Sequence, residues 1–464
     1  MADQKIDVSD IQGFALKGYN FPHARYLLIE LGRPDAARAL LMKLLNVITT
    51  GERWDLTKKP VSTVNIGFTH KGLVQLDLPL ESLLSFPLEF QQGMRARGDI
   101  LGDTAKNAPE NWDPEWREDH IHAWLAVNAL TPEALESRCA DMLYLMEETQ
   151  GACLVRAQEA CAIYVDGKAS TQEHFGYTDG FGNPDFKGAE RRCTPGQGKL
   201  DEHGNWQALA TGEFLLGYAD EAGELPPAPD PHLLGRNGTF MVYRKLHQNV
   251  AAFRNYLAEH GVRYAGGEAK LAAKFVGRWQ DGTPLELSPD APDPAIVKDE
   301  SRNTDFTYGG DLGGVRCPIG AHIRRTHPRD AFGFNGGLVN RRRIMRRGLP
   351  YGEYVPPGQT ANDAEERGIV FMVLNASIFR QFEFVQQQWI EYGNDAHQGN
   401  DKDFLIGNHE GKGRFVIQGD TNPNNPPFIC GGLPNFVELR GGDYFFIPSL
   451  TALAMMATEN VDPR

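Results

Sequence analysis

The sequence predicts an α+β protein made of two ferredoxin-like domains, in which antiparallel sheets pack against helices. Strand-like and helix-like segments follow the order β-α-β twice in the first half of the chain, and the same order returns in the second half. The length of 464 residues also favours two or three domains over one. We expect an N-terminal domain over residues 1–185, a connecting segment over 186–212 and a C-terminal domain over 213–464.

Hydrophobic periodicity places the elements of the first half. The strand-like segments are residues 25–32, 62–69, 120–127 and 153–165, the last as one strand or a bent pair. Pro34 begins a helix whose apolar stripe includes Leu40 and Leu44. A second helix is expected from Pro132 to Glu148, where apolar residues again recur at helical spacing.

The second half repeats this pattern with longer irregular stretches. Strands are expected over residues 214–218, 238–243, 367–374 and 444–447, and helices over residues 247–260, 271–279 and 379–392. Residues 180–212, 219–237 and 280–320 read as loops. Long loops inside a compact protein are commonly functional, so the chemistry is expected among these segments.

Composition excludes several classes of protein. An apolar fraction of 41% and a charged fraction of 23% are ordinary for a globular chain. The net charge of -14 and the pI near 5.4 argue against a nucleic-acid partner and suit an enzyme with neutral or cationic substrates. No apolar run approaches the roughly 18 residues of a membrane span, and the N-terminus has no signal peptide pattern. We therefore expect a cytoplasmic protein without membrane contact. The sequence is compatible with a homo-oligomer.

The six cysteines are scattered and form no C-x-x-C pair. This spacing argues against a zinc ribbon, a thioredoxin-type redox site and a covalently attached c-type haem. In a chain of this length such cysteines are typical of reduced thiols. The chain also lacks a G-x-S-x-G elbow, a P-loop and an HExxH motif, so hydrolase, NTPase and zincin functions have no support.

The segment from Cys317 to Arg329, CPIGAHIRRTHPR, is the most informative part of the sequence. It holds His322 in a setting bounded by proline and glycine, with arginines on the following positions. A rigidly held imidazole beside several guanidinium groups suits the ligation of an iron porphyrin, because the arginines can neutralise its propionates. His322 is therefore the candidate iron ligand, although a single histidine is also compatible with a structural role.

Two further segments carry candidate catalytic groups. Asp179 lies in the sequence GYTDG, where flanking glycines are typical of a turn and also leave room for a flat cofactor. Arg346 belongs to the cluster RRRIMRRGLPYG, which begins at Arg341. Charge runs are usually solvated, but the turn after Arg346 fixes its position. A histidine, an aspartate and an arginine on separate loops predict the two sides of a haem peroxidase site.

Together these motifs resemble the dye-decolourising peroxidase family, specifically its larger subfamily, over most of the chain. The G-x-x-D-G signature matches Gly176 to Gly180, and the haem-ligand segment matches the residues around His322. The resemblance implies two ferredoxin-like domains and a non-covalent haem b with His322 as the iron ligand. The other haem-binding positions that it implies are Gly180, Phe181, Gly182, Arg329, Ile369, Phe371 and Asp403.

The resemblance also implies a reaction: reduction of hydrogen peroxide and one-electron oxidation of bulky aromatic donors such as dyes and phenolics. Asp403 would orient the ligand histidine, Asp179 would transfer a proton between the peroxide oxygens, and Arg346 would stabilise the developing negative charge. Tyr351 and Trp389 are candidate surface relays to bulky donors. Two alternatives stay open: a catalase-like or chlorite-converting haem enzyme, and a non-enzymatic haem carrier or iron-release protein.

Overall fold

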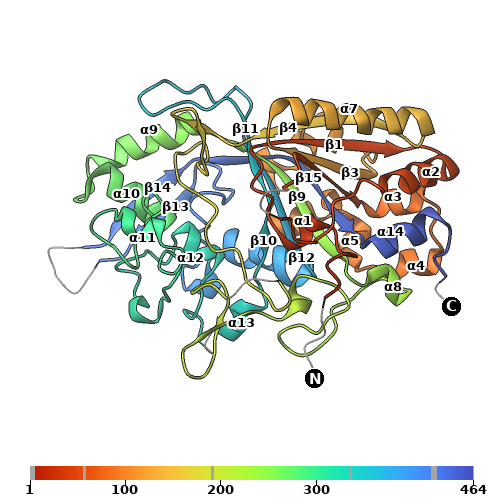
Figure 1. Ribbon diagram of the computed structural model, residues 1–464. Helices are drawn as coiled ribbons and strands as arrows, with labels where there is room; N and C mark the ends of the chain where they lie inside the picture. Colours follow the sequence, from red (N-terminus) through yellow and green to blue (C-terminus); the bar gives the residue numbers. More distant parts are fainter. Residues whose placement is uncertain (1–5, 56–58, 190–192, 334–335, 420–425, 463–464) are drawn as a thin grey trace.

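The computed structural model describes residues 6–55, 59–189, 193–333, 336–419 and 426–462. Its central feature is a nine-stranded sheet with the order β10-β12-β9-β15-β2-β3-β1-β4, and β11 pairs with β12. The neighbouring strands of this sheet run antiparallel. Helices and long loops surround the sheet, and the loops gather at the end that carries α10, α11 and α12 (Figure 1). The predicted α+β class is confirmed.

The first half forms one ferredoxin-like unit. Its elements are β1 (His23–Leu31), α2 (Pro34–Leu44), β2 (Ser62–Phe68), β3 (Ala123–Ala129), α7 (Pro132–Thr149) and β4 (Ala152–Cys161). The strands lie in the order β4-β1-β3-β2, which is the arrangement of a β-α-β-β-α-β unit. Every residue of β2 and β3 is buried, so both faces of these strands are covered. At the start of α7 the hydroxyl of Thr131 accepts the N–H of Ala134 and so caps the helix.

The second half repeats the unit. Its elements are β9 (Thr239–Gln248), α9 (Val250–Gly261), α10 (Gly267–Val276), β10 (Met345–Arg346), β11 (Leu349–Gly352), β12 (Arg367–Asn375), β15 (Val437–Ile447) and α14 (Leu450–Ala457). The order β15-β9-β12-β10 repeats that of β4-β1-β3-β2 in the first half: the fourth strand of the unit comes first, followed by its first, third and second strands. The domain boundaries at residues 185/186 and 212/213 stay predictions.

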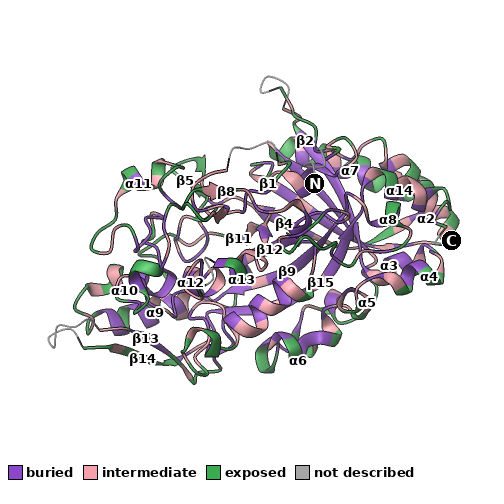
Figure 2. Cartoon of the chain, turned by 90° about the horizontal axis from the view of Figure 1, so that it is seen from below, coloured by how far each residue is buried: buried purple, intermediate pink, exposed green. Residues whose placement is uncertain are grey.

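The two halves share one sheet, because β15 pairs with β2 where Phe446 lies opposite Phe68. At the far ends of the order β11 lies against β4, so the sheet curls toward a barrel. Aromatic side chains fill its core: the ring of Tyr26 lies 5.9 Å from Trp124 and 6.4 Å from Tyr243. Figure 2 shows this sheet as the buried centre of the molecule, with exposed residues on the helices and loops around it.

The remaining elements are short. The helices are α1 (Gly13–Leu16), α3 (His70–Gln75), α4 (Leu80–Ser85), α5 (Leu88–Gln92), α6 (Gly98–Leu101), α8 (His232–Gly235), α11 (Pro294–Lys298), α12 (His322–Thr326) and α13 (Gly337–Asn340). The strands are β5 (Tyr164–Val165), β6 (Lys168–Ala169), β7 (Lys199–Leu200), β8 (Trp206–Gln207), β13 (Gly413–Ile417) and β14 (Phe428–Leu433). Two consecutive π-helical segments are η9 (Phe379–Glu383) and η10 (Val385–Ile390). The 3₁₀ turns are η2 (Arg95–Arg97), η3 (Ala105–Asn107), η4 (Pro109–Asn111), η5 (Pro114–Trp116), η6 (Thr211–Glu213), η7 (Gly309–Asp311) and η11 (Asn394–Ala396).

Three local predictions are wrong. Residues 214–218 form turns after η6 rather than a strand, because a short buried apolar run does not by itself identify a strand. Residues 247 and 248 complete β9 instead of beginning the next helix, which starts at Val250. The helix expected over residues 379–392 is π-helical and ends at Ile390.

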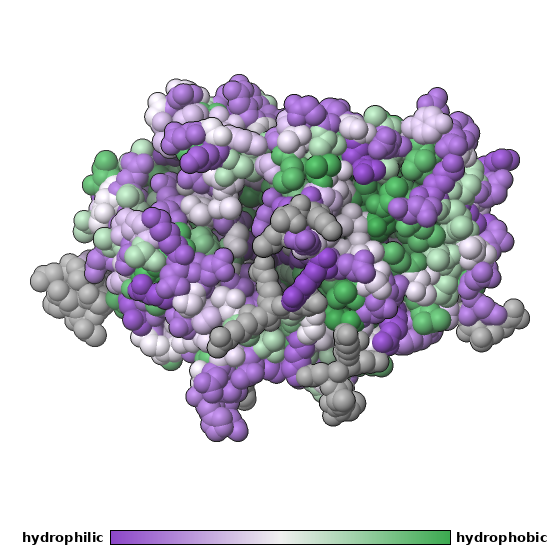
Figure 3. Space-filling model, viewed as in Figure 1, coloured by the Kyte–Doolittle hydropathy of each residue, from purple (hydrophilic) through white to green (hydrophobic). Residues whose placement is uncertain are grey.

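One end of the molecule exposes apolar side chains. Leu80 and Leu84 of α4 and Leu88 of α5 are each more than 60% exposed. Figure 3 shows apolar colour gathered at this end of the surface, over the region of α3, α5 and α14 in Figure 1. Among the described residues, no helix has both the length and the apolar character that crossing a membrane would require.

The fold depends on close backbone packing at β12, and replacing Gly368 with alanine tests this. A Cβ at Gly368 would overlap the carbonyl oxygen of Leu246 on β9. We expect Gly368→Ala to lower the free energy of unfolding by about 1–3 kcal/mol, the usual cost of overpacking. Gly431→Ala on β14 is the matched control, because no described atom lies within 4 Å of its added Cβ. Equal stability of both variants in urea denaturation would contradict this packing.

Candidate active site

Three separate segments bring the predicted catalytic residues to one place. Asp179 follows the hairpin that begins near Thr171, Arg346 ends β10, and His322 begins α12. The guanidinium of Arg346 donates from one terminal nitrogen to Oδ1 of Asp179 at 2.7 Å. The charges of both residues also act on the pKa of His322, so the three groups lie within electrostatic reach of one another.

His322 is oriented by a buried carboxylate. Its Nδ1 donates to Asp403, at 3.0 Å from Oδ2 and 3.1 Å from Oδ1. Burial of the imidazole acts to lower the pKa of His322, but the charge of Asp403 and this hydrogen bond outweigh burial and raise it. Asp403 is itself fixed, because its Oδ1 accepts the backbone N–H groups of Leu405 and Ile406 at 2.9 Å. The arrangement leaves Nε2 as the ring nitrogen that can bind a metal.

Asp179 is held with one oxygen engaged and one free. Its Oδ1 accepts from the N–H of Gly180 at 2.6 Å as well as from Arg346. No described residue donates a hydrogen bond to Oδ2. Burial acts to raise the pKa of Asp179, yet the charge of Arg346 and the N–H of Gly180 outweigh it and lower the pKa. The carboxylate is therefore kept ionised with a free oxygen that can accept a proton.

A second buried carboxylate shapes the hairpin that carries Asp179. Glu173 accepts the backbone N–H groups of Phe175 and Tyr177, each at 2.9 Å. The side-chain amide of Gln248 on β9 also donates to it and ties the hairpin to the sheet. Burial raises the pKa of Glu173 to about 7. Gly176, at the tip, has a φ of +94°, which favours glycine.

Arg346 is positioned by the loop that follows Asp179. Its backbone N–H donates to the side-chain oxygen of Asn183 at 3.0 Å, and its second terminal nitrogen donates to the carbonyl of Phe181 at 2.5 Å. The β10–β12 pairing places Arg346 opposite Val373. Phe181 thus contributes its carbonyl, while the guanidinium of Arg278 lies 4.9 Å from the centre of its ring.

The accessible surfaces of the three side chains define a hollow beside them. The side chains of Asp179, Arg346 and His322 are 50%, 34% and 24% exposed. Burial is nevertheless the largest influence on the pKa of both Asp179 and His322, so their accessible surfaces face an interior space rather than bulk solvent. No described atom lies within 4 Å of where a Cβ of Gly180 would stand. Ile369 and Phe371 are half-buried while Val370 between them is fully buried, as expected if alternate residues of β12 face this hollow.

Three buried arginines near the site lack carboxylate partners among the described residues. Arg278, Arg329 and Arg343 donate instead to backbone carbonyls, for example Arg278 to Gly282 at 2.7 Å and Arg329 to Phe306 at 2.7 Å. Burial lowers the pKa of all three, and the charge of Arg329 lowers the pKa of Arg278 and Arg343 further. Buried cations need counter-charges, so this cluster suits an anionic group such as the propionates of haem.

Sequence reasoning found part of this arrangement. It identified His322, Asp403, Asp179 and Arg346, and the structure brings these four together. It missed Asn183, Gln248, Arg278 and Arg343, which hold these residues or add charge and have no motif of their own. The expectation of surface relays is wrong for Tyr351 and Trp389, because each is only 4% exposed.

Comparisons with known proteins agree with the fold. The family model described as the DyP dimeric alpha+beta barrel domain matches residues 10–154. A dye-decolorizing peroxidase from Mycena epipterygia is 30% identical, over 98% of this chain and 88% of its own length. A multifunctional dye peroxidase from an Amycolatopsis species is 32% identical, over 96% of this chain and 95% of its own length. The solved structure of a dye-decolorizing peroxidase in complex with 2,6-dimethoxyphenol superposes with a TM-score of 0.83, at 27% identity, over 97% of this chain and 100% of that one.

The unpaired arginine cluster leads to a prediction about the cofactor-free protein. Replacing Arg343 with glutamine removes a buried charge that burial and Arg329 disfavour. We expect the free energy of unfolding at pH 7 to rise by about 1–2 kcal/mol, while the affinity for haem falls. Chemical denaturation and haem titration measure the two effects. Arg33→Gln is the matched control, since the side chain of Arg33 is 84% exposed; a less stable Arg343→Gln protein would argue against charge repulsion in this cluster.

Proposed function

The chain belongs to the dye-decolourising peroxidase family, and from this premise we propose which residues perform its reaction. The protein is an oxidoreductase that acts on hydrogen peroxide and oxidises aromatic donors by one-electron steps. In the overall reaction one hydrogen peroxide and two donor molecules yield two waters and two donor radicals. The observation that supports our assignment is the ion pair of Asp179 and Arg346, which shares one hollow with His322.

The residues around the hollow suit a non-covalently held haem b. Nε2 of His322 would bind the iron, since Nδ1 is committed to Asp403. Arg278, Arg329 and Arg343 would supply positive charge for the propionates, and Gly180, Gly182, Ile369 and Phe371 would line the ring. When bound, haem supplies the redox centre that takes oxidising equivalents from peroxide and passes them to the donors. Asp403 strengthens the imidazole as a ligand by accepting its other N–H.

Asp179 would move the proton that allows the O–O bond of hydrogen peroxide to break. Its free Oδ2 takes a proton from one peroxide oxygen and delivers it to the other, which then leaves as water. The low pKa of Asp179 keeps this oxygen unprotonated in mildly acidic solution. Gly180 beside Asp179 leaves the approach open, because it has no side chain and no described atom lies within 4 Å of the place where a Cβ would stand.

Arg346 would have two roles, one toward Asp179 and one toward the departing oxygen. Its contact with Oδ1 keeps Asp179 ionised, and its remaining N–H groups can stabilise the negative charge that develops on the departing oxygen. Asn183 and Phe181 fix the guanidinium before peroxide arrives, so little reorganisation is needed during the reaction. A protein that only carries or releases haem has no use for such a pair, and the pair therefore favours the peroxidase.

Bulky aromatic donors, including dyes and phenolics, would be oxidised away from the hollow, whose walls include Ile369 and Phe371. We also place the protein in the cytoplasm, since all six cysteines are free, as expected in a reducing compartment.

Loss of the imidazole tests the ligand assignment. We expect His322→Ala to bind haem weakly and to lose its Soret band, because the substitution removes Nε2, the proposed ligand of the iron. Added imidazole should restore part of the absorbance, which separates loss of the ligand from misfolding. His203→Ala serves as the control, since His203 is 74% exposed. A His322→Ala protein with full haem content and full peroxidase activity would rule out this role.

The ion pair of Asp179 and Arg346 predicts the acid limb of the pH profile. Asp179 works as a base when ionised, so activity should fall as the pH drops through its lowered pKa. In Arg346→Leu that pKa rises, and the loss should begin at a pH about one unit or more higher. The measurement is kcat/KM for hydrogen peroxide between pH 2.5 and 7. Arg346→Lys, which keeps the charge, should shift the limb less; identical acid limbs in all three proteins would remove Arg346 from this role.

A further inference from the structure

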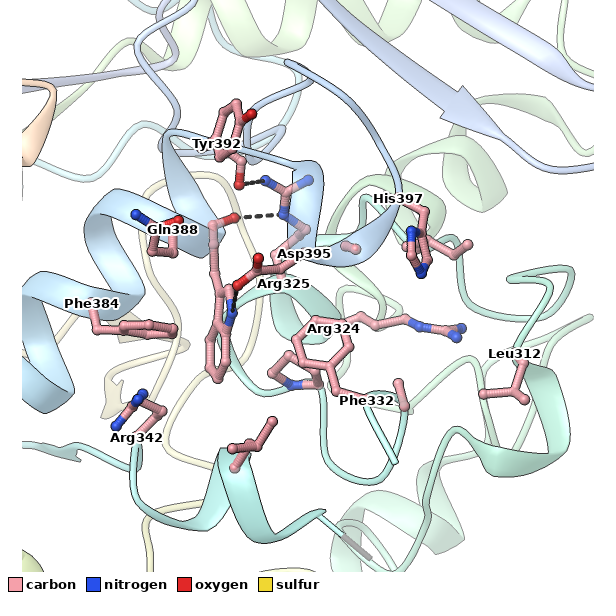
Figure 4. A pocket seen from close by; sticks show the side chains of 16 residues that line it. Leu312, Arg324, Arg325, Phe332, Arg342, Phe384, Gln388, Tyr392, Asp395 and His397 are labelled. Carbon is pink, nitrogen blue, oxygen red and sulfur yellow. Dashed lines mark hydrogen bonds between the residues drawn. The ribbon is translucent and has the colours of Figure 1, made fainter. Parts of the chain in front are cut away.

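A second cavity lies outside the hollow of Asp179, Arg346 and His322. It has a volume of about 440 Å³ and lies between α12, α13, the π-helical segment η10 and the 3₁₀ turn η11, which contains Asp395 (Figure 4). Pockets for small molecules usually measure about 300–1,000 Å³, so one or two fused rings fit here. A π-helical segment also forms part of its wall, and such segments are frequent at functional sites.

Aromatic side chains form one wall of this cavity. The ring of Trp389 lies 5.7 Å from that of Phe332 and 5.5 Å from that of Phe384, both in edge-to-face geometry. Trp389 is buried behind them, whereas Phe332 and Phe384 remain partly exposed. A planar aromatic molecule can therefore stack or pack edge-on against rings that are already fixed in place.

The cavity also holds an unpaired cation. The guanidinium of Arg342 lies 4.0 Å from the centre of the Phe384 ring, and Figure 4 shows the two side chains close together at one side of the cavity. Its side chain forms no ion pair or hydrogen bond with any described residue. Burial lowers the pKa of Arg342, and the charges of Arg380 and Arg341 lower it further. An anion bound there would offset this repulsion with charge-assisted hydrogen bonds.

The lining also includes one carboxylate, Asp395, and two further arginines, Arg324 and Arg325, which already donate to Asp311 and to backbone carbonyls. Asp395 accepts from the indole N–H of Trp389 at 3.3 Å and lies away from Arg342 in Figure 4. A second negative charge on a ligand would face this carboxylate and be repelled. Among the described lining residues, Arg342 is thus the arginine whose donors are not already engaged, and Asp395 disfavours a second negative charge on the ligand.

We propose that this cavity is a binding site for a planar aromatic monoanion, such as an arylsulfonate or an aryl carboxylate. The ring system packs against Phe332 and Phe384, and the anionic group faces Arg342. The site is separate from the peroxide site and does not depend on the assignment of His322, Asp179 or Arg346.

Calorimetric titration of the haem-loaded protein with naphthalene-2-sulfonate tests the proposal. We expect saturable binding at one site, weakened about tenfold or more in Arg342→Gln, which corresponds to the loss of one charge-assisted contact. Leu338→Trp, which fills the cavity, should abolish binding. Naphthalene-2-methanol lacks the charge, so it should bind the wild type more weakly than naphthalene-2-sulfonate does. Its affinity should be the same for the wild type and for Arg342→Gln.

The controls separate this site from the peroxide site and from misfolding. Arg33→Gln and Arg346→Leu should bind naphthalene-2-sulfonate like the wild type, and the Soret band should show intact haem loading in each variant. Two results would overturn the proposal: no binding to the wild type at millimolar ligand, or binding that neither Arg342→Gln nor Leu338→Trp reduces. If binding behaves as expected while the His322→Ala protein keeps its haem, only the ligand assignment fails.

Discussion

The antiparallel pairing of β12 with its neighbours is the constraint on which the site depends. β12 pairs with β9 on one edge and with β10 and β11 on the other. One face of β12 adds Val370 and Met372 to the sheet core, and the alternate face presents Ile369 and Phe371. The same ladder fixes Arg346 on β10. A slip of one residue in this register would turn the apolar core residues outward and the site residues inward, so packing of the core enforces the geometry of the site.

Three buried arginines cost folding free energy in the absence of a ligand. Arg278, Arg329 and Arg343 compensate burial with backbone carbonyls, which are weaker partners for a cation than carboxylates. By contrast, the buried Arg97 of η2 pairs with the carboxylate of Glu383 in η9. A carboxylate placed among the three arginines would compete with an anionic cofactor for the same donors. This competition explains why the three arginines pair with carbonyls whereas Arg97 pairs with a carboxylate. The positive charge of these three arginines is therefore compatible with a site whose charge is balanced when an anionic cofactor binds.

Much of the fold could be predicted from the sequence, since strand and helix periodicity reveal the order of elements in each half. The pairing of β15 with β2 could not, because it joins segments that are far apart in the chain through a single pair of facing residues, Phe446 and Phe68. The π-helical course of residues 379–390 was also missed, since an apolar stripe does not distinguish α from π hydrogen bonding. In the site, His322 and Asp179 stand in recognisable motifs, whereas Asn183 and Gln248 act through single hydrogen bonds that any loop or strand end could supply.

The run from Arg341 to Arg347 shows why charge patterns in a sequence are hard to interpret. Adjacent guanidinium groups enter different surroundings: Arg341 pairs with the buried Asp220 at 2.9 Å, Arg342 lies over Phe384, and Arg343 reaches the carbonyl of Gly182 beside the peroxide site. The chain turns after α13, so side chains at successive positions point in different directions. One short segment therefore supplies cations to a structural ion pair, to the second cavity and to the hollow. Because the backbone is shared, a substitution that shifts this turn would alter all three, whereas a change confined to one guanidinium would alter only its own surroundings.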